Sequence, residues 1–330
     1  IKKILKLRES GEKFFGKKSF KERNGKDFTV PYKRYDTMMG KRKEYFQSCK
    51  PGLVYIHTSN EFVSHIPEKI PLDRTFGFLI GIYLADGWAT KTFIGVSNNC
   101  PKIRGIVQEF CDRYGITYHT VFSSSKNVRN GKTTDLKIHS TLLARMFLAI
   151  CNTGSEKKKV PDFCYTAPRL FLEGLFDGYF SGDGTVNKKD GSIIASSASQ
   201  DLLLGISFLA SYFGVFGRQS VVNVKKNNVG SLNIKKSYTL RISNGFAQKF
   251  AKAFTLTAEE KNKRLREVTL AKNYRYKKGI SQEKFPERDV FFDKVVSVEY
   301  VKGSAEFVYD LTVEKTRNFQ AAEAKKKKGQ

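Results

Sequence analysis

Two stretches of the chain combine the length of a helix with an almost unbroken apolar surface. They are TFGFLIGIYLADG (75–87) and PRLFLEGLFDGYFSGDG (168–184), and both end in Asp-Gly. Small residues recur in them at every fourth position: Gly77, Gly81 and Ala85 in the first, and Gly174, Gly178 and Gly182 in the second. This spacing places the small residues on one helix face, where another backbone can approach closely. Because glycine inside a helix costs about 1 kcal/mol relative to alanine, the pattern predicts two helices packed together through their glycines.

The acids Asp86 and Asp183 stand at the last positions of the two predicted helices. Gly87 and Gly184 follow them and are expected to adopt the left-handed conformation of a helix cap. A carboxylate at a helix C-terminus faces the negative end of the helix dipole, and two such acids side by side repel each other. A divalent cation is the natural compensation. A single Asp-Gly could simply end a helix, but the repetition with matched glycine spacing favours a metal site.

The segments that follow the two acids repeat the same order of patterns. In the first copy a strand-like run (92–99) precedes a helix that ends at 113–116 and a basic stretch that reaches 135–147. In the second copy the corresponding segments are 192–199, a helix ending at 212–215, and 238–250. Each copy is therefore expected to run helix, two strands, helix, two strands, helix. The sequence predicts an α+β fold in which two such copies pair through their first helices at a pseudo-twofold axis, flanked by two four-stranded sheets.

The charge of the chain points to a polyanionic partner. Lys and Arg number 59 against 32 Asp and Glu, which gives a formal net charge of +27. If the outer faces of the two sheets form one concave surface, a DNA duplex could lie in it, because strand ribbons fit the major groove. A solvated surface charge is the alternative for each residue taken alone. The basic positions expected on this surface are Lys126, Arg129, Lys132, Lys137, Arg218, Lys225, Lys226, Lys235, Lys236 and Arg241.

Other features of the composition narrow the class of protein. No stretch approaches 18 uninterrupted apolar residues, and the N-terminal segment lacks the pattern of a secretory signal, so a soluble intracellular protein of nucleus or cytoplasm, without a membrane partner, is expected. Five cysteines without a CxxC pair support neither a disulfide framework nor a zinc ribbon. Because both copies lie in one chain, a monomer is expected.

The segments LIGIYLADG (79–87) and FDGYFSGDG (176–184) resemble the paired motifs of the LAGLIDADG homing endonucleases, specifically the single-chain kind found inside inteins. This resemblance implies that Asp86 and Asp183 are the catalytic, metal-binding acids and that Gly81 and Gly178 lie at the helix interface. It implies hydrolysis of both DNA strands with Mg²⁺, leaving short 3′ overhangs. Because the two halves differ in loops and basic residues, a long, asymmetric target is expected.

The same resemblance proposes two catalytic lysines. EKKKVPDF (156–163) is similar to the Lys-x-Ile/Val-Pro segment that precedes the second motif in the family, which makes Lys158 the first candidate. The corresponding segment of the second copy is AEEKNKRL (258–265). Lys261 is the preferred candidate there and Lys263 the second.

The ends of the chain resemble parts of the splicing module of inteins. FVYDLTVEKTRNF (307–319) is similar to a segment near intein C-termini, with Arg317 where a histidine is expected, and GKDFTVPY (25–32) carries Tyr32 at another histidine position. With Ile1 at its start, the chain is expected to lack the splicing nucleophiles. The alternatives to an endonuclease are therefore a self-splicing intein whose terminal residues are absent, and an RNA-splicing maturase or DNA-binding protein on the same fold. The expected domains are 1–66 (N-terminal part of a Hint-like or DNA-binding region), 67–164 and 165–275 (the two halves), 276–320 (C-terminal Hint-like strands) and 321–330 (basic tail).

Overall fold

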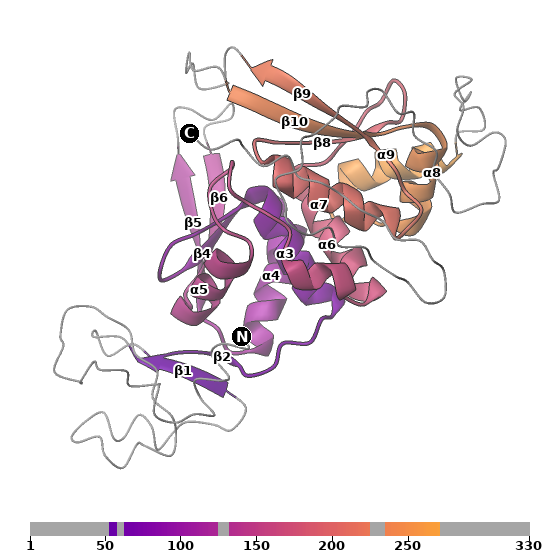
Figure 1. Ribbon diagram of the computed structural model, residues 1–330. Helices are drawn as coiled ribbons and strands as arrows, with labels where there is room; N and C mark the ends of the chain where they lie inside the picture. Colours follow the sequence, from indigo (N-terminus) through magenta and orange to yellow (C-terminus); the bar gives the residue numbers. More distant parts are fainter. Residues whose placement is uncertain (1–52, 58–62, 125–131, 225–234, 271–330) are drawn as a thin grey trace, which may run out of the picture.

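The computed structural model describes residues 53–57, 63–124, 132–224 and 235–270 (Figure 1). Two consecutive units share one order of elements. The first unit consists of α3 (Arg74–Asp86), β3 (Gly87–Ala89), β4 (Ile94–Ser97), α4 (Pro101–Arg113), β5 (Tyr118–Ser124), β6 (Lys132–Ile138) and α5 (Thr141–Ile150). The second consists of α6 (Arg169–Gly182), β7 (Thr185–Val186), β8 (Ile193–Ser197), α7 (Gln200–Ser211), β9 (Arg218–Val224), β10 (Lys235–Ile242) and α8 (Asn244–Ala253), and α9 (Glu259–Leu270) follows it. The expected duplicated α+β order is confirmed.

Each unit forms its own antiparallel four-stranded sheet. The strand orders are β3-β4-β6-β5 and β7-β8-β10-β9, so the two sheets have the same topology. One face of each sheet packs on helices of its own unit, and in Figure 1 α7 lies against β8 and β10. The inward positions are apolar and buried: Val96, Leu136 and Ile138 in the first sheet, and Ala195 and Leu240 in the second. The alternating positions form the outer faces.

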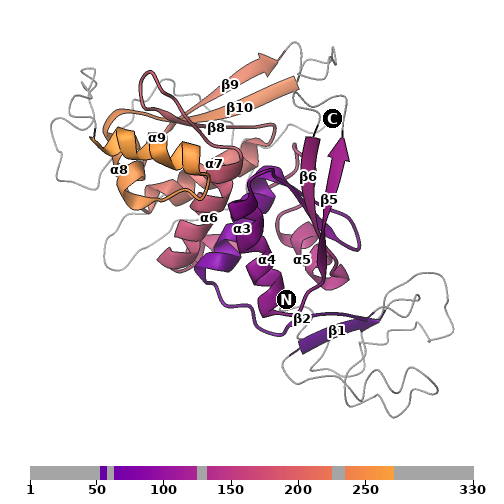
Figure 2. The ribbon, with the colours of Figure 1, turned by 180° about the vertical axis from the view of Figure 1, so that it is seen from behind.

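Helices α3 and α6 lie side by side at the centre of the molecule, and both views show them between the two sheets (Figures 1 and 2). Their backbones touch along the glycine stripe. A Cβ added at Gly77 would lie 2.0 Å from the main-chain oxygen of Phe171, and one at Gly81 would lie 2.1 Å from that of Leu175. The reciprocal distances are 2.1 Å from Gly174 to the oxygen of Arg74 and 2.3 Å from Gly178 to that of Phe78. Only glycine leaves room for this approach.

The ends of the two central helices correct one prediction. Asp86 is the last residue of α3, whereas Asp183 is the residue just after α6. Neither Gly87 nor Gly184 adopts a left-handed conformation, because the chain passes almost directly into a strand; Gly87 has φ −92° and ψ 157°. Glycine is needed at both positions for space instead. A Cβ would lie 2.5 Å from the Cα of Tyr83 at Gly87, and 2.5 Å from the oxygen of Phe180 at Gly184.

The two units are connected by residues 151–168, which include the short 3₁₀ helix η2 (Asp162–Thr166). Before the first unit, β1 (Leu53–His57) and β2 (Val63–Pro67) form a hairpin that contacts α5. The remaining segments assigned to a Hint-like region, together with Tyr32 and Arg317, lie outside the described residues. Within the described part of the chain, no helix has both the length and the apolar character needed to cross a bilayer.

Candidate active site

The two motif acids meet at one end of the central helix pair. The Asp86 carboxylate accepts a hydrogen bond from Asn98 Nδ2 at 2.7 Å. It also lies against the end of the other helix, because a Cβ added at Gly182 would be 3.0 Å from Asp86 Oδ2 and 2.5 Å from Ala85 Cβ. Asp183 follows Gly182 directly, and part of this residue reaches the surface although the surrounding atoms restrict hydration of its carboxylate. The two acids, 97 positions apart in the sequence, therefore belong to one cluster.

The electrostatics of the acids reflect this proximity. Burial raises the pKa of Asp86, opposed by the hydrogen bond from Asn98 and by the charges of Lys261 and Lys158. Loss of hydration and repulsion from Asp86 raise the pKa of Asp183 to about 6, with Lys158 and Lys261 acting in the opposite direction. Two carboxylates that each disfavour the other's ionisation are a pair that gains from a shared cation.

Lys158 and Lys261 occupy matching places in the two halves. Lys158 is 6% exposed, and its Nζ donates to the main-chain oxygens of Leu84 and Ala85, each at 3.0 Å. Lys261 Nζ donates to the oxygens of Ser181 at 2.7 Å and Gly182 at 2.5 Å. Each ammonium group thus satisfies carbonyls that the last turn of a motif helix leaves free.

The lysines are also coupled to both acids. Burial lowers the pKa of Lys158 and of Lys261, while Asp183 and Asp86 act to raise both. Lys263 lies on the exposed side of α9. Of the two lysines considered for the second half, Lys261 is therefore the one at the end of α6.

The cluster contains two carboxylates and two lysine ammonium groups, so it offers few oxygen atoms that could coordinate a metal ion. No group of three or more His, Cys, Asp or Glu side chains suited to hold a metal occurs among the described residues. A cation held by Asp86 and Asp183 would need further oxygen ligands from water or from a bound phosphate. Oxygen-only donors suit Mg²⁺ and similar hard cations.

The expected DNA-contacting residues fall into four groups. Lys137 occupies the outer face of the first sheet, and Arg218 and Arg241 are cross-strand partners on the outer face of the second. Every second residue of a strand faces the same side, and Lys236 falls in step with Leu240 and Ile242, which are buried against the helices. Lys236 therefore does not belong to the outer face. Lys132 and Lys235 are the first residues of β6 and β10. The positions outside the described residues are Lys126, Arg129, Lys225 and Lys226.

Sequence reasoning missed Asn98, which contacts Asp86. Its Oδ1 accepts from Cys100 N at 2.9 Å, which fixes the side chain just before α4 begins. The pair Asn98-Asn99 ahead of Pro101 is a recognisable turn signal. The contact with an acid 12 positions earlier depends on the antiparallel pairing of β3 with β4, which this local signal does not contain.

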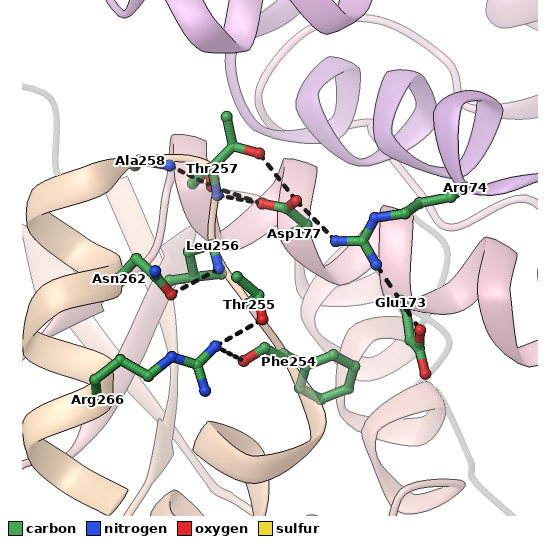
Figure 3. A network of polar contacts seen from close by, with 11 residues as sticks. Arg74, Glu173, Asp177, Phe254, Thr255, Leu256, Thr257, Ala258, Asn262 and Arg266 are labelled. Carbon is green, nitrogen blue, oxygen red and sulfur yellow. Dashed lines mark hydrogen bonds and ion pairs between the residues drawn. The ribbon is translucent and has the colours of Figure 1, made fainter.

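Sequence reasoning also missed a buried polar network on the outer side of α6 (Figure 3). The carboxylate of Asp177 accepts from Thr257 N at 2.6 Å, Thr257 Oγ1 at 2.9 Å, Ser181 Oγ at 3.0 Å and Arg74 Nη2 at 3.2 Å. Asp177 stands inside an apolar helix pattern, and an isolated acid there is the signal that was available.

The fold and the acid-lysine cluster together define a duplicated α+β protein with one site at the junction of its halves. The chain matches the family of LAGLIDADG-like domains twice, at residues 73–151 and 167–254, and it belongs to this family.

The curated relatives are much longer proteins. The chain is 29% identical over 309 residues to the DNA-directed RNA polymerase subunit Rpo1C of Methanocaldococcus jannaschii, a match that covers 77% of this chain and 35% of that protein. It is 25% identical to the DNA polymerase II large subunit of Thermococcus kodakarensis (73% and 14% covered) and 23% identical to one subunit of the A-type ATP synthase of Pyrococcus abyssi (76% and 27% covered). The chain thus spans about a third or less of the length of these relatives.

Solved structures with a similar fold include I-DmoI in complex with DNA and Ca, at 13% identity and a TM-score of 0.41, which covers 56% of this chain and 91% of that one. Full-length DUF199/WhiA from Thermatoga maritima matches at 10% identity and a TM-score of 0.40, with 62% of this chain and 65% of that one covered.

Proposed function

We propose that the chain is a site-specific DNA endonuclease that hydrolyses both strands of a long, asymmetric duplex target. The observation that carries this proposal is the meeting of Asp86 and Asp183 at one end of the α3–α6 pair, with the ammonium groups of Lys158 and Lys261 beside them. Two chemically alike half-sites related by the pseudo-twofold axis match a reaction that occurs twice, once on each strand.

The residues present fit a divalent metal. Two carboxylates that repel each other and offer only oxygen donors suit Mg²⁺, which retains several water or phosphate ligands. Asp86 and Asp183 would hold it. When bound, such a cation stabilises negative charge on a phosphate and lowers the pKa of a coordinated water.

The chain's own residues perform the remaining tasks. The outer faces of the sheets, with Lys137, Arg218 and Arg241, bind and orient the duplex through its phosphates and base edges. Lys158 and Lys261 are fixed by main-chain carbonyls, so their charges need no rearrangement as negative charge develops on the scissile phosphates. Preorganised charge of this kind is among the largest contributions to catalysis.

Cleavage of a randomised duplex library in Mg²⁺ tests the proposal. The wild type is expected to cut both strands of a defined subset of the sequences. Asp86→Asn, Asp183→Asn and Lys158→Met are each expected to cut at least about 100-fold more slowly while still binding the same DNA. Lys159→Met is the matched control, because Lys159 lies next to Lys158 and forms an exposed ion pair with Asp162.

Undiminished cutting by either aspartate variant would show that the acids are structural. If the wild type cuts no sequence but binds duplex or structured RNA, the chain is a binding protein or maturase on this fold.

A second candidate concerns the origin of the chain. The relatives are part of an RNA polymerase, DNA polymerases and part of an ATP synthase, which have unrelated activities, yet each shares a segment of this length. A segment common to unrelated hosts is typical of an inserted element, so we infer that the chain derives from an intein.

Expression of the chain with the residues that flank it in its gene tests this origin. If the flanking residues supply the splicing nucleophiles that the chain is expected to lack, mass spectrometry should detect the ligated flanks and an excised chain. A precursor that remains intact while it still cleaves DNA would rule out self-splicing, and the endonuclease proposal would still hold.

A further inference from the structure

The two lysines of the candidate active site are held in place by different hydrogen-bond arrangements. In the first half, the main-chain oxygen of Lys158 accepts from Ser199 Oγ at 2.6 Å, and Ser199 is the N-cap of α7 in the second half. Lys158 N also donates to the oxygen of Gly154 at 3.3 Å. This lysine is therefore positioned through its own backbone.

In the second half, Lys261 is the third residue of α9, and the start of α9 is tied to α6 by side chains. Asp177 binds both the N–H and the hydroxyl of Thr257, and Ser181 Oγ accepts from Ala258 N at 3.2 Å. A carboxylate and a hydroxyl of one helix thus cap the beginning of another (Figure 3). A negative charge at a helix N-terminus is also favoured by the helix dipole.

The first half has no counterpart of this network among its described residues. Aligning Gly81 with Gly178 places Ile80 opposite Asp177 and Leu84 opposite Ser181. Both Ile80 and Leu84 are buried hydrophobic residues. The polar pair is therefore a feature of the second motif alone, and helix packing does not require it.

Asp177 is nearly fully buried, with 5% of its side chain exposed, and it requires partners for each oxygen. Arg74, at the start of α3, donates to it at 3.2 Å and approaches Glu173 at 3.8 Å. The network therefore connects α3, α6 and the segment that leads to Lys261.

We propose that Asp177 is a positioning residue for Lys261, acting through Thr257, and that its removal impairs the cut of one DNA strand but not of the other. The first part concerns only the protein; the second rests on the proposed endonuclease activity. The two parts can therefore fail separately.

The first experiment measures the accessibility of Lys261 without any activity. The full-length wild type, Asp177→Asn and Thr257→Val are treated with an amine-reactive reagent, and the labelling rates of Lys261 and Lys158 are read by mass spectrometry, with exposed Lys263 as the reference. Both variants are expected to label Lys261 about tenfold faster, because local opening of the start of α9 becomes easier, and to leave Lys158 unchanged. Thr257→Val keeps the shape and volume of the side chain, so it serves if Asp177→Asn folds poorly.

The matched control is Asp190→Asn. Asp190 also accepts from the N–H (3.0 Å) and the hydroxyl (2.7 Å) of one residue, Ser192, and pairs with an arginine, Arg241, but it lies in the loop between β7 and β8. It should not change the labelling of Lys261. Labelling of Lys261 at the wild-type rate in both Asp177→Asn and Thr257→Val would overturn the positioning role.

The second experiment resolves the two strands of a target identified from the library. Asp177→Asn is expected to slow the same strand as Lys261→Met, so that nicked DNA accumulates, while Lys158→Met slows the other strand. Equal slowing of both strands by Asp177→Asn would overturn the strand-specific part. If the wild type cuts nothing, the endonuclease proposal fails, and the labelling result still decides whether Asp177 positions Lys261.

Discussion

The charged ammonium group of Lys158 lies in the protein interior, where water has almost no access. Burial of an ammonium group is costly unless hydrogen bonds and opposite charges compensate. The carbonyls of Leu84 and Ala85 supply the first, and Asp183 and Asp86 supply the second. The lysine also takes over the capping of α3 that a left-handed glycine was expected to provide. This explains how Gly87 can be extended without leaving the helix end unsatisfied.

The pKa of Asp183 leads to a prediction for the chain without metal or DNA. Its pKa is about 6 in the folded protein, against about 3.9 in an unfolded chain. As the pH falls from 7 toward 4, the folded state takes up the proton first, so the free energy of unfolding should increase over this range. Asp183→Asn should weaken this dependence and be more stable than the wild type at pH 7. Urea unfolding in the presence of EDTA at several pH values measures it, and identical pH profiles would contradict it.

Two tyrosines of the central helices give opposite predictions for the same substitution. Tyr179 is fully buried, and its hydroxyl has no hydrogen-bond partner among the described residues, whereas the hydroxyl of Tyr83 donates to the oxygen of Asn152 at 2.6 Å. Removing an unsatisfied hydroxyl relieves a cost, and removing a bonded one creates it. Tyr179→Phe should therefore raise the free energy of unfolding by about 1 kcal/mol and Tyr83→Phe should lower it by about the same amount. Chemical denaturation of both variants measures this difference, and a loss of stability in Tyr179→Phe would indicate a partner.

At the scale of elements, α3 and α6 meet in direct backbone contact at four glycines, and side chains such as Phe76 and Phe171 contact each other beside these positions. The four glycines that make this contact are spaced so that each meets a main-chain oxygen of the other helix. At these four positions the close approach is set by main-chain atoms, which cannot move aside to accommodate a larger residue.

Replacing one of these glycines by alanine should lower the stability of the fold, whereas the same substitution at a glycine with free space around it should raise the stability. The Cβ of Gly81→Ala would lie 2.1 Å from the oxygen of Leu175, so we expect a loss of about 3 kcal/mol or more, because the helices must separate. Gly105 in α4 has no atom within 4 Å of an added Cβ, so Gly105→Ala should stabilise the chain by about 0.5–1 kcal/mol. Thermal unfolding compares the two. Equal stability of Gly81→Ala and the wild type would mean that the helices do not approach this closely.

The elements show how far the sequence alone could lead. The helix pair, the two sheets and their order could be predicted because glycine spacing and strand alternation are local patterns that occur twice. The acids and Lys158 could be placed by motif. Asn98 and the Asp177–Thr257 contact could not, because they depend on which loops lie beside α3 and α6 after packing. Lys236 alternates in step with Leu240 and Ile242 of the same strand, a pattern that the sequence itself contains.

At the scale of the whole molecule, a net charge of +27 is combined with two sheets whose outer faces carry few charges in the described residues. Arg241 is paired with Asp190, and Lys137 lies over the ring of Phe93 at 5.5 Å. Such restrained cations suit a surface that orients a polyanion, because their geometry is set before binding.

Two cations on the outer faces, Lys137 and Arg218, predict how DNA binding depends on salt. If Lys137 and Arg218 each contact a phosphate, Lys137→Ala and Arg218→Ala should weaken binding to all duplexes and reduce the slope of log K against log salt by about 1 each. Lys252→Ala, in the last turn of α8, is the control and should leave the slope unchanged. Fluorescence anisotropy over a range of salt concentrations measures this. An unchanged slope for both sheet variants would remove these residues from the interface.

The main-chain contact between the glycines of α3 and α6 has a consequence for how such a protein can change over evolutionary time. The separation of the two acids depends on the peptide groups that meet at these glycines. Substitutions elsewhere do not change the size of peptide groups, so this separation stays constant. The sheets, in contrast, can exchange residues on their outer faces without disturbing that spacing. New recognition specificities can therefore arise one surface position at a time while the reaction geometry is inherited intact.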